Sequence, residues 1–263
     1  WSFALKNIQE YFVAKIVSEL SFDEIIKLLR IDNNINKVHP TWYNVVSFML
    51  NLISDETIYN SLINWLLSND YEILFNADSD RITEDIKSKV LISLFTKNCI
   101  EDNLWINDAK GIASFSECNS NIEYLISNMK DTNIHRRARM SAIKLLSYMN
   151  VPELFFEELK INIINIIKES DDDDVNYVYL IQDAIMLSKS LNINSDIKFF
   201  NKIIELLYER DNKEIISSII YSVPIQSVIE NINYFLEILE KSIGNKKWKT
   251  VSKYNSITST KDN

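Results

Sequence analysis

The stretch SNIEYLISNMKDTNIHRRARMSAIKLLSYM, residues 120–149, decides the fold that we expect for this chain. Apolar residues recur in it at the three- and four-residue spacing of amphipathic helices. Ser120 and Glu123 have the spacing of a capping box, as do Ser21 and Glu24 earlier in the chain. In a capping box each side chain satisfies a free backbone N–H of the first helical turn. The segment from residue 133 repeats the helical pattern after a short polar connection. Residues 120–149 therefore predict two helices joined by a short turn.

Similar pairs follow along the chain. They begin near residues 121, 153 and 195, a spacing of roughly 30 to 40 residues that is typical of helical repeats. A single pair cannot bury both of its faces and must stack on its neighbours. We therefore predict an all-α protein, an α-solenoid of antiparallel helix pairs with HEAT- or armadillo-like stacking. Within the first pair, Asn133, Arg139, Ala142 and Leu145 resemble the second helix of a HEAT repeat, in which the arginine reaches a polar turn residue of an adjacent repeat.

Glycine and proline are scarce, with 2 Gly and 3 Pro in 263 residues. Average usage would give roughly 18 and 13. Since tight turns, hairpins and phosphate-binding loops depend on glycine, the chain is expected to be helical throughout. The two glycines, Gly111 and Gly244, lie far apart, so neither G-x-x-x-x-G-K-[ST] nor G-x-G-x-x-G can be written in this sequence. We expect no nucleotide-binding motif and no cofactor in this chain.

Charge and cysteine usage narrow the partners and the compartment. The formal net charge of -9 argues against nucleic acid, whose phosphates require a basic surface. Cys99 and Cys118 have no CxxC spacing and are interpreted as reduced thiols of a cytosolic protein. No apolar run reaches the roughly 18 residues of a membrane span. We therefore expect a cytoplasmic protein that has no membrane partner.

A basic cluster, His135, Arg136, Arg137 and Arg139, lies near the start of an expected helix. The helix macrodipole disfavours cations there, so carboxylates or an anionic ligand must offset the cost. One interpretation is a structural ladder with Asp131 and neighbouring acids. The other is a patch on the concave face that binds an anion or a protein partner.

Other polar groups favour structural roles. The acidic run ESDDDDV, residues 169–175, lacks the spacing and the glycine of a calcium-binding EF-hand loop and is interpreted as a solvated connection. His39 and His135 have no metal-ligand partners at suitable spacing. Glu157 and Glu158 have no nucleophile or base beside them. We therefore expect no catalytic residue and no metal site.

The opening segment WSFALKNIQEYFVAKIV, residues 1–17, predicts a helix with one apolar stripe. The stripe consists of Leu5, Ile8, Phe12, Ile16 and Leu20, widened by Tyr11, Ala14 and Val17. The segment resembles the one that closes the winged-helix part of NACHT-type STAND NTPases, the superfamily of NOD-like receptors and bacterial antiphage defence proteins. The matching residues are Phe3, Ile8, Gln9, Glu10, Tyr11, Phe12 and Ala14. Leu5 stands where the family has a phosphate-facing histidine, so no nucleotide-sensing role carries over to that position.

The resemblance implies an organisation and a function. Residues 1–20 would connect to an upstream NTPase domain of the same polypeptide, where ATP and Mg would bind. Residues 21–243 would form the helical-repeat domain, with a bend near 98–119, and 244–263 a polar, basic tail or a truncated repeat. The chain would be the non-catalytic sensing arm of a bacterial defence protein, recognising a phage or host protein. The alternative is a free-standing helical-repeat scaffold or adaptor.

Overall fold

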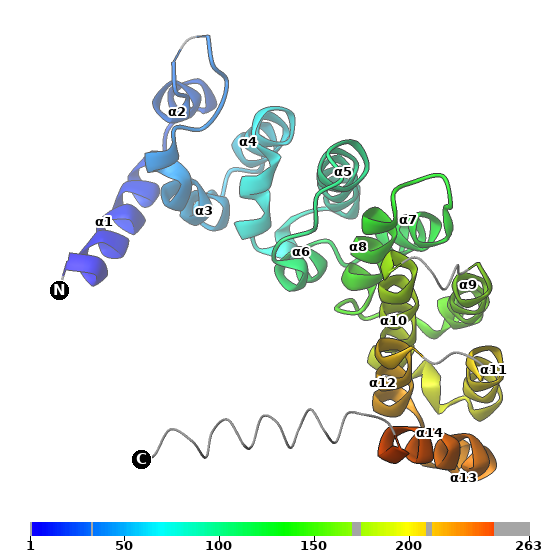
Figure 1. Ribbon diagram of the computed structural model, residues 1–263. Helices are drawn as coiled ribbons and strands as arrows, with labels where there is room; N and C mark the ends of the chain where they lie inside the picture. The colour runs from blue at the N-terminus through cyan, green and yellow to red at the C-terminus, as the bar shows by residue number, and fades with distance from the viewer. Residues whose placement is uncertain (1, 33, 170–174, 209–211, 245–263) are drawn as a thin grey trace, which may run out of the picture. The chain divides into compact units, whose positions relative to one another are not determined.

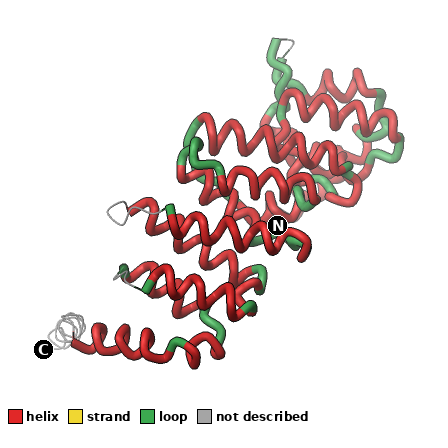
Figure 2. The backbone as a smooth tube through the Cα atoms, turned by 90° about the vertical axis from the view of Figure 1, so that its right-hand side faces the viewer, coloured by secondary structure: helices red, strands yellow, loops and turns green. Residues whose placement is uncertain are grey.

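A computed structural model describes residues 2–32, 34–169, 175–208 and 212–244 (Figure 1). Throughout these ranges the chain forms helices joined by loops, and no strand is present (Figure 2). An isolated antiparallel bridge joins Arg30 and Val38. The prediction of an all-α protein is confirmed.

The chain divides into two compact units, Trp1–Phe155 and Phe156–Asn263, which are described separately. This division falls inside the range 21–243 that the sequence analysis treats as one domain. The expected tail lies outside the described residues beyond Gly244. The boundaries expected at residues 20 and 243 stay predictions.

The first unit contains eight α-helices within its described residues. They are α1 (Ser2–Val17), α2 (Phe22–Leu29), α3 (Tyr43–Leu52), α4 (Glu56–Asn69), α5 (Glu84–Phe95), α6 (Ala109–Phe115), α7 (Asn119–Lys130) and α8 (Arg136–Leu146). Short 3-10 helices η1 (Pro40–Trp42), η2 (Tyr71–Asn76), η3 (Ser79–Arg81) and η5 (Glu153–Phe155) and the π-helix η4 (Thr96–Glu101) complete it. The looser stretch expected near 98–119 corresponds to η4, a loop and the short α6.

Packing in this unit links several helices to the next but one. Helix α1 packs against α3, α2 against α4, α5 against α7 and α6 against α8, while α7 and α8 also pack on each other. Aliphatic side chains such as Leu29, Met49, Leu62 and Leu91 are fully buried between them. Each such side chain contributes about 1.5 to 3 kcal/mol relative to exposure.

The second unit repeats this pattern. Its helices are α9 (Phe156–Lys168), α10 (Val175–Ser190), η6 (Ile193–Ser195), α11 (Ile197–Leu207), α12 (Lys213–Ser222), α13 (Ile225–Glu230) and α14 (Ile232–Gly244). Helix α9 packs on α10 and on α11, α10 packs on α12, and α11 packs on α13 (Figure 1). Leu159, Ile163, Leu180 and Ile203 are among its buried side chains.

Helix α1 buries a narrower face than its apolar stripe predicts. Ala14 and Val17 are buried, and α1 packs against α3. Ile8, Phe12 and Ile16 are 53%, 56% and 67% exposed. The apolar stripe is therefore buried along one edge only, where Ala14 and Val17 lie. An apolar row of three large side chains is left on the surface of α1.

Helix ends follow capping chemistry in one of the two predicted places. At α2, the Glu24 carboxylate accepts from the Ser21 backbone N–H at 3.0 Å. Bonds from the Ser21 side chain and backbone lower the pKa of Glu24. At α7 the capping box is wrong, because the helix begins one residue before Ser120, whose hydroxyl contacts Ser88 Oγ at 2.8 Å instead. In the described part of the chain, no helix is long and apolar enough to span a membrane.

Candidate functional site

The predicted basic cluster divides into residues with different surroundings. His135 is the N-cap of α8, and its Nδ1 accepts a hydrogen bond from the Arg137 backbone N–H at 3.2 Å. An N-cap acceptor satisfies a backbone donor that the helix itself leaves free. His135 therefore has a structural role in starting α8, as His39 does at η1, where its Nδ1 accepts from Thr41 N at 3.3 Å.

Arg139 does not belong to a surface patch. Its side chain is 2% exposed, and Nε donates to the carbonyl oxygen of Met129 at 2.9 Å. Met129 lies in the last turn of α7, where carbonyls lack helical partners and where the dipole favours a cation. The assignment of Arg139 to a partner-binding patch is therefore wrong. Arg139 joins α7 to α8 within one helix pair, and Ala142 and Leu145 are buried beside it.

Arg137, two positions before Arg139, is exposed and reaches the loop that follows η4. Its Nη1 donates to the carbonyl oxygen of Asn103 at 3.4 Å. Its guanidinium carbon lies 5.9 Å from the centre of the Trp105 ring. This distance is at the outer limit of a cation–π contact. The structure therefore brings one predicted site residue together with an aromatic residue that sequence reasoning did not single out.

The loop carrying Trp105, residues 102–108, is held at both ends. The Leu104 N–H donates to the Asn98 carbonyl at 2.7 Å. At the other end the Asp108 carboxylate accepts from Gly111 N at 3.2 Å and caps α6. Asn103 and Asp108 adopt positive φ angles of 53° and 45°, a conformation that costs a non-glycine residue of the order of 1 kcal/mol. Because these bonds oppose that cost, the loop presents a defined surface.

Two adjacent large side chains are exposed on this loop, Leu104 at 53% and Trp105 at 49%. Trp and Arg are the residue types most enriched at the centres of protein interfaces. We name Leu104, Trp105 and Arg137 the Trp105 site. The sequence contains an indication of this site. Leu104 and Trp105 fall in a stretch without helical periodicity, where apolar side chains need not face a helical core.

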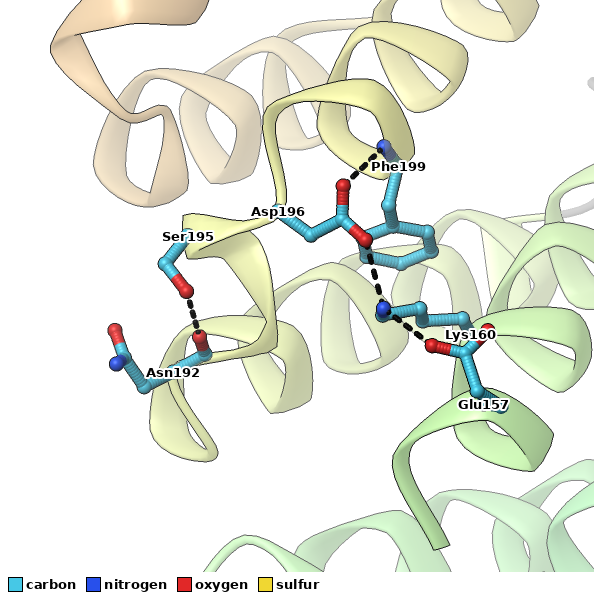
Figure 3. Close-up of polar contacts among 6 residues, drawn as sticks. All are labelled: Glu157, Lys160, Asn192, Ser195, Asp196 and Phe199. Carbon is cyan, nitrogen blue, oxygen red and sulfur yellow. Dashed lines mark hydrogen bonds and ion pairs between the residues drawn. The ribbon is translucent and has the colours of Figure 1, made fainter. Parts of the chain in front are cut away.

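A second polar cluster has a structural character (Figure 3). In the second unit, Lys160 of α9 donates to Asp196 Oδ2 at 2.7 Å and to Glu157 Oε1 at 2.7 Å. Asp196 is the N-cap of α11 and accepts from Phe199 N at 3.2 Å. The bond to Asp196, then that to Glu157, raises the pKa of Lys160, and the same Lys160 bond is the first cause that lowers the pKa of Asp196. Lys160, Glu157 and Asp196 thus each have a charged partner within the cluster. The bond between Lys160 and Asp196 connects α9 to the start of α11.

Polar contacts between segments recur at a regular sequence separation. Side-chain hydrogen bonds of this kind join Asn51 and Asp78, Ser88 and Ser120, Glu117 and Asn150, Lys160 and Asp196, Lys189 and Tyr221, and Asn201 and Asn231. Their separations range from 27 to 36 residues. Each of these bonds lies within one of the two compact units, and the range of separations is close to the length of one helix pair.

Cys99 and Glu157 lie in surroundings that favour structural roles. Cys99 is buried, and burial raises the pKa of its thiol to about 11, which leaves it protonated at neutral pH. Within the described ranges, no three His, Cys, Asp or Glu side chains are grouped so that they could hold a metal ion. Glu157 is engaged by Lys160. The acidic run at 170–174 lies outside the described residues.

The residues that carry the family resemblance lie on α1. Glu10 accepts from Asn44 Nδ2 at 3.1 Å and lies 3.8 Å from the Lys6 ammonium. Gln9 and Tyr11 are exposed, as are Ile8 and Phe12. The side chain of Phe3 is outside the part of the structure that is described.

Comparisons with known proteins do not assign a family. No family model matches the chain, and neither the curated proteins nor the solved structures include a significant match.

Proposed function

We propose that this chain is a non-catalytic helical-repeat arm that recognises a protein partner. The observation that carries this proposal is the regular linkage of segments 27 to 36 residues apart. Together with the packing of several helices on the next but one, it supports an α-solenoid of stacked helix pairs, in which each repeat contacts only its neighbours. Arrays of this kind act by presenting an extended surface to a ligand.

The resemblance of α1 to NACHT-type STAND NTPases supports a more specific context, a sensing arm joined to an upstream NTPase domain. The exposed row of Ile8, Phe12 and Ile16 is consistent with this context. Three large apolar side chains on one helix face are the kind of surface that a neighbouring domain covers. In this proposal, partner binding shifts the whole protein between a closed and an assembly-competent state because the partner binds the two states with different affinity.

Two measurements test this proposal. The first is to sequence the reading frame of the encoding gene on the 5′ side of the codon for Trp1. We expect an in-frame region with Walker A and Walker B motifs; an initiation codon directly before Trp1 would reject the NTPase context.

The second measurement is ATP hydrolysis by the purified chain. We expect no turnover above the rate of a heat-denatured sample, because neither glycine motif for phosphate binding can be written in the sequence. Turnover that scales with protein concentration and is removed by a substitution in this chain would show that it is an enzyme.

A further inference from the structure

We propose that the Trp105 site, formed by Leu104, Trp105 and Arg137, docks an acidic protein segment that carries one large apolar side chain. This inference rests on the proposed function, because it names the kind of partner that a recognition arm would bind. All three residues lie in the first compact unit. The apolar anchor would cover Leu104 and the Trp105 ring, and a carboxylate beside it would pair with the Arg137 guanidinium.

The apolar half of the argument is the exposure of two adjacent side chains. Leu104 and Trp105 keep about half of their surfaces in water, although each would gain free energy from burial. Tryptophan is among the residue types that are enriched at the centres of protein interfaces.

The charged half of the argument is an arginine without a carboxylate partner among the described residues. Arg137 is exposed and uses one donor on the Asn103 carbonyl, at the long distance of 3.4 Å. The nearby acids Glu101 and Asp102 form no ion pair with it, and Asp108 is engaged at the N-terminus of α6. Since the guanidinium fork matches a carboxylate in two parallel hydrogen bonds, an acidic ligand complements it.

The geometry also favours a low cost of binding. The loop is anchored by the bond from Leu104 N to Asn98 O at 2.7 Å and by the contact between Arg137 and Asn103. Ordering of flexible loops is a main cost of association, and a loop that is already held avoids much of it. Arg137 thus has two roles, in holding the loop and in presenting charge beside the Trp105 ring.

A protein ligand fits this site better than a nucleic acid. Single-stranded nucleic acids also stack on tryptophan, but their binding sites combine the aromatic ring with a basic groove that follows several phosphates. At this site Arg137 is the cation recorded beside the Trp105 ring. One guanidinium matches one carboxylate, whereas a run of phosphates needs several cations along a groove.

The first experiment selects ligands from a displayed library of random 12-residue peptides, using the full chain as bait and its Trp105→Ala variant for counter-selection. We expect the enriched sequences to place Asp or Glu within four residues of a Leu, Ile, Phe or Trp. Enrichment of basic sequences, or no enrichment over the variant, would overturn the inference. A fluorescent oligothymidylate is titrated in parallel, and binding that depends on Trp105 would identify a nucleic-acid site instead.

The second experiment measures a synthetic enriched peptide against single variants. We expect at least a tenfold loss of affinity in Trp105→Ala and in Arg137→Ala. The matched control is Tyr148→Ala, because Tyr148 is also exposed and lies 5.2 Å from a cation, the Lys144 ammonium, at the other end of α8. We expect this control to bind as the natural sequence does. An equal loss in Tyr148→Ala would contradict a specific Trp105 site.

A charge exchange separates recognition from loss of structure. The Arg137→Glu variant should bind the acidic peptide at least tenfold more weakly, and should bind better a peptide in which lysines replace the acids. Unchanged discrimination in the folded variant, checked by its helical circular dichroism, would overturn the role of Arg137. The reading frame of the encoding gene tests the NTPase context. The results of these binding experiments do not change the outcome of that test.

Discussion

At the scale of single residues, two arginines on one helix have opposite environments. Arg137 is exposed beside Trp105, while Arg139 is buried and donates to the Met129 carbonyl. Positions i and i+2 lie about 200° apart around a helix, so the two arginine side chains leave the helix on different faces. The sequence does not show which of these faces is covered. The burial of one and the exposure of the other depend on where α7 lies.

Replacing Arg139 by alanine should destabilise the chain by about 2 to 3 kcal/mol, because it leaves a buried cavity and an unsatisfied carbonyl at the end of α7. The matched variant Arg137→Ala should change the free energy of unfolding by no more than about 0.5 kcal/mol. Urea denaturation followed by circular dichroism measures both. Equal losses in the two variants would show that the division of the cluster is wrong.

Cys99 should be unreactive in the folded chain, since it is buried and its pKa is raised to about 11. The Cys118→Ser variant leaves Cys99 as the remaining thiol. With Ellman's reagent at pH 8, we expect no rapid reaction of this variant until denaturant is added. Release of one equivalent of chromophore from the native variant within the mixing time would contradict the burial of Cys99.

At the scale of elements, helices were predictable to different degrees. Periodicity identified the helical segments, and local chemistry placed the start of α2, because Ser21 and Glu24 are satisfied within one turn. The start of α7 was not predictable in this way, because Ser120 bonds to Ser88 on another helix. The exposed row on α1 escaped prediction for a similar reason. A pattern of apolar residues does not say which part of a stripe meets a neighbour.

Helix α1 offers a test of which face is packed. Ala14→Leu places a larger side chain against α3 and should cost about 1 to 3 kcal/mol through overpacking. Phe12→Ser should change the free energy of unfolding by no more than about 0.5 kcal/mol, because Phe12 is exposed. Thermal denaturation of the two variants distinguishes the faces. A larger loss for Phe12→Ser than for Ala14→Leu would mean that the row on α1 is packed within this chain.

The bond between α9 and α11 predicts a pH dependence. Lys160 is the first cause that holds the pKa of Asp196 below its ordinary value of 3.8. A carboxyl whose folded pKa is lowered stabilises the fold above its unfolded pKa, and the contribution is lost as pH falls through the folded pKa. Asp196→Asn, which keeps an N-cap acceptor, should therefore cost up to about 1 kcal/mol at pH 7 and progressively less below about pH 4.

Urea denaturation of this variant and of the natural sequence at pH 7 and at pH 3 measures the difference. The control is Glu157→Gln, which removes the more exposed acid from the same lysine and should have a smaller effect. A stability difference for Asp196→Asn that grows on acidification would contradict the ion-pair explanation.

At the scale of the whole molecule, a repeated rule links the segments. Polar side chains bond to residues 27 to 36 positions away, and helices pack on the next but one. Periodicity and the scarcity of glycine were sufficient to predict an all-α chain, which the structure confirms. The division after Phe155 was not predictable, since the connection to α9 has no composition that marks a boundary. The proposed ligand site includes Trp105, and its exposure could be established only from the three-dimensional structure.

Native-state hydrogen exchange tests most directly the central claim that the chain is an array of helix pairs, each stabilised by its neighbours. The measurement compares the natural sequence with Leu145→Ala, which removes a fully buried side chain of α8 and should cost about 2 to 5 kcal/mol. We predict faster exchange in α5 to α8 and unchanged exchange in α12 and α13. An equal loss of protection in every helix would show that the chain unfolds as one cooperative body and would contradict the repeat account.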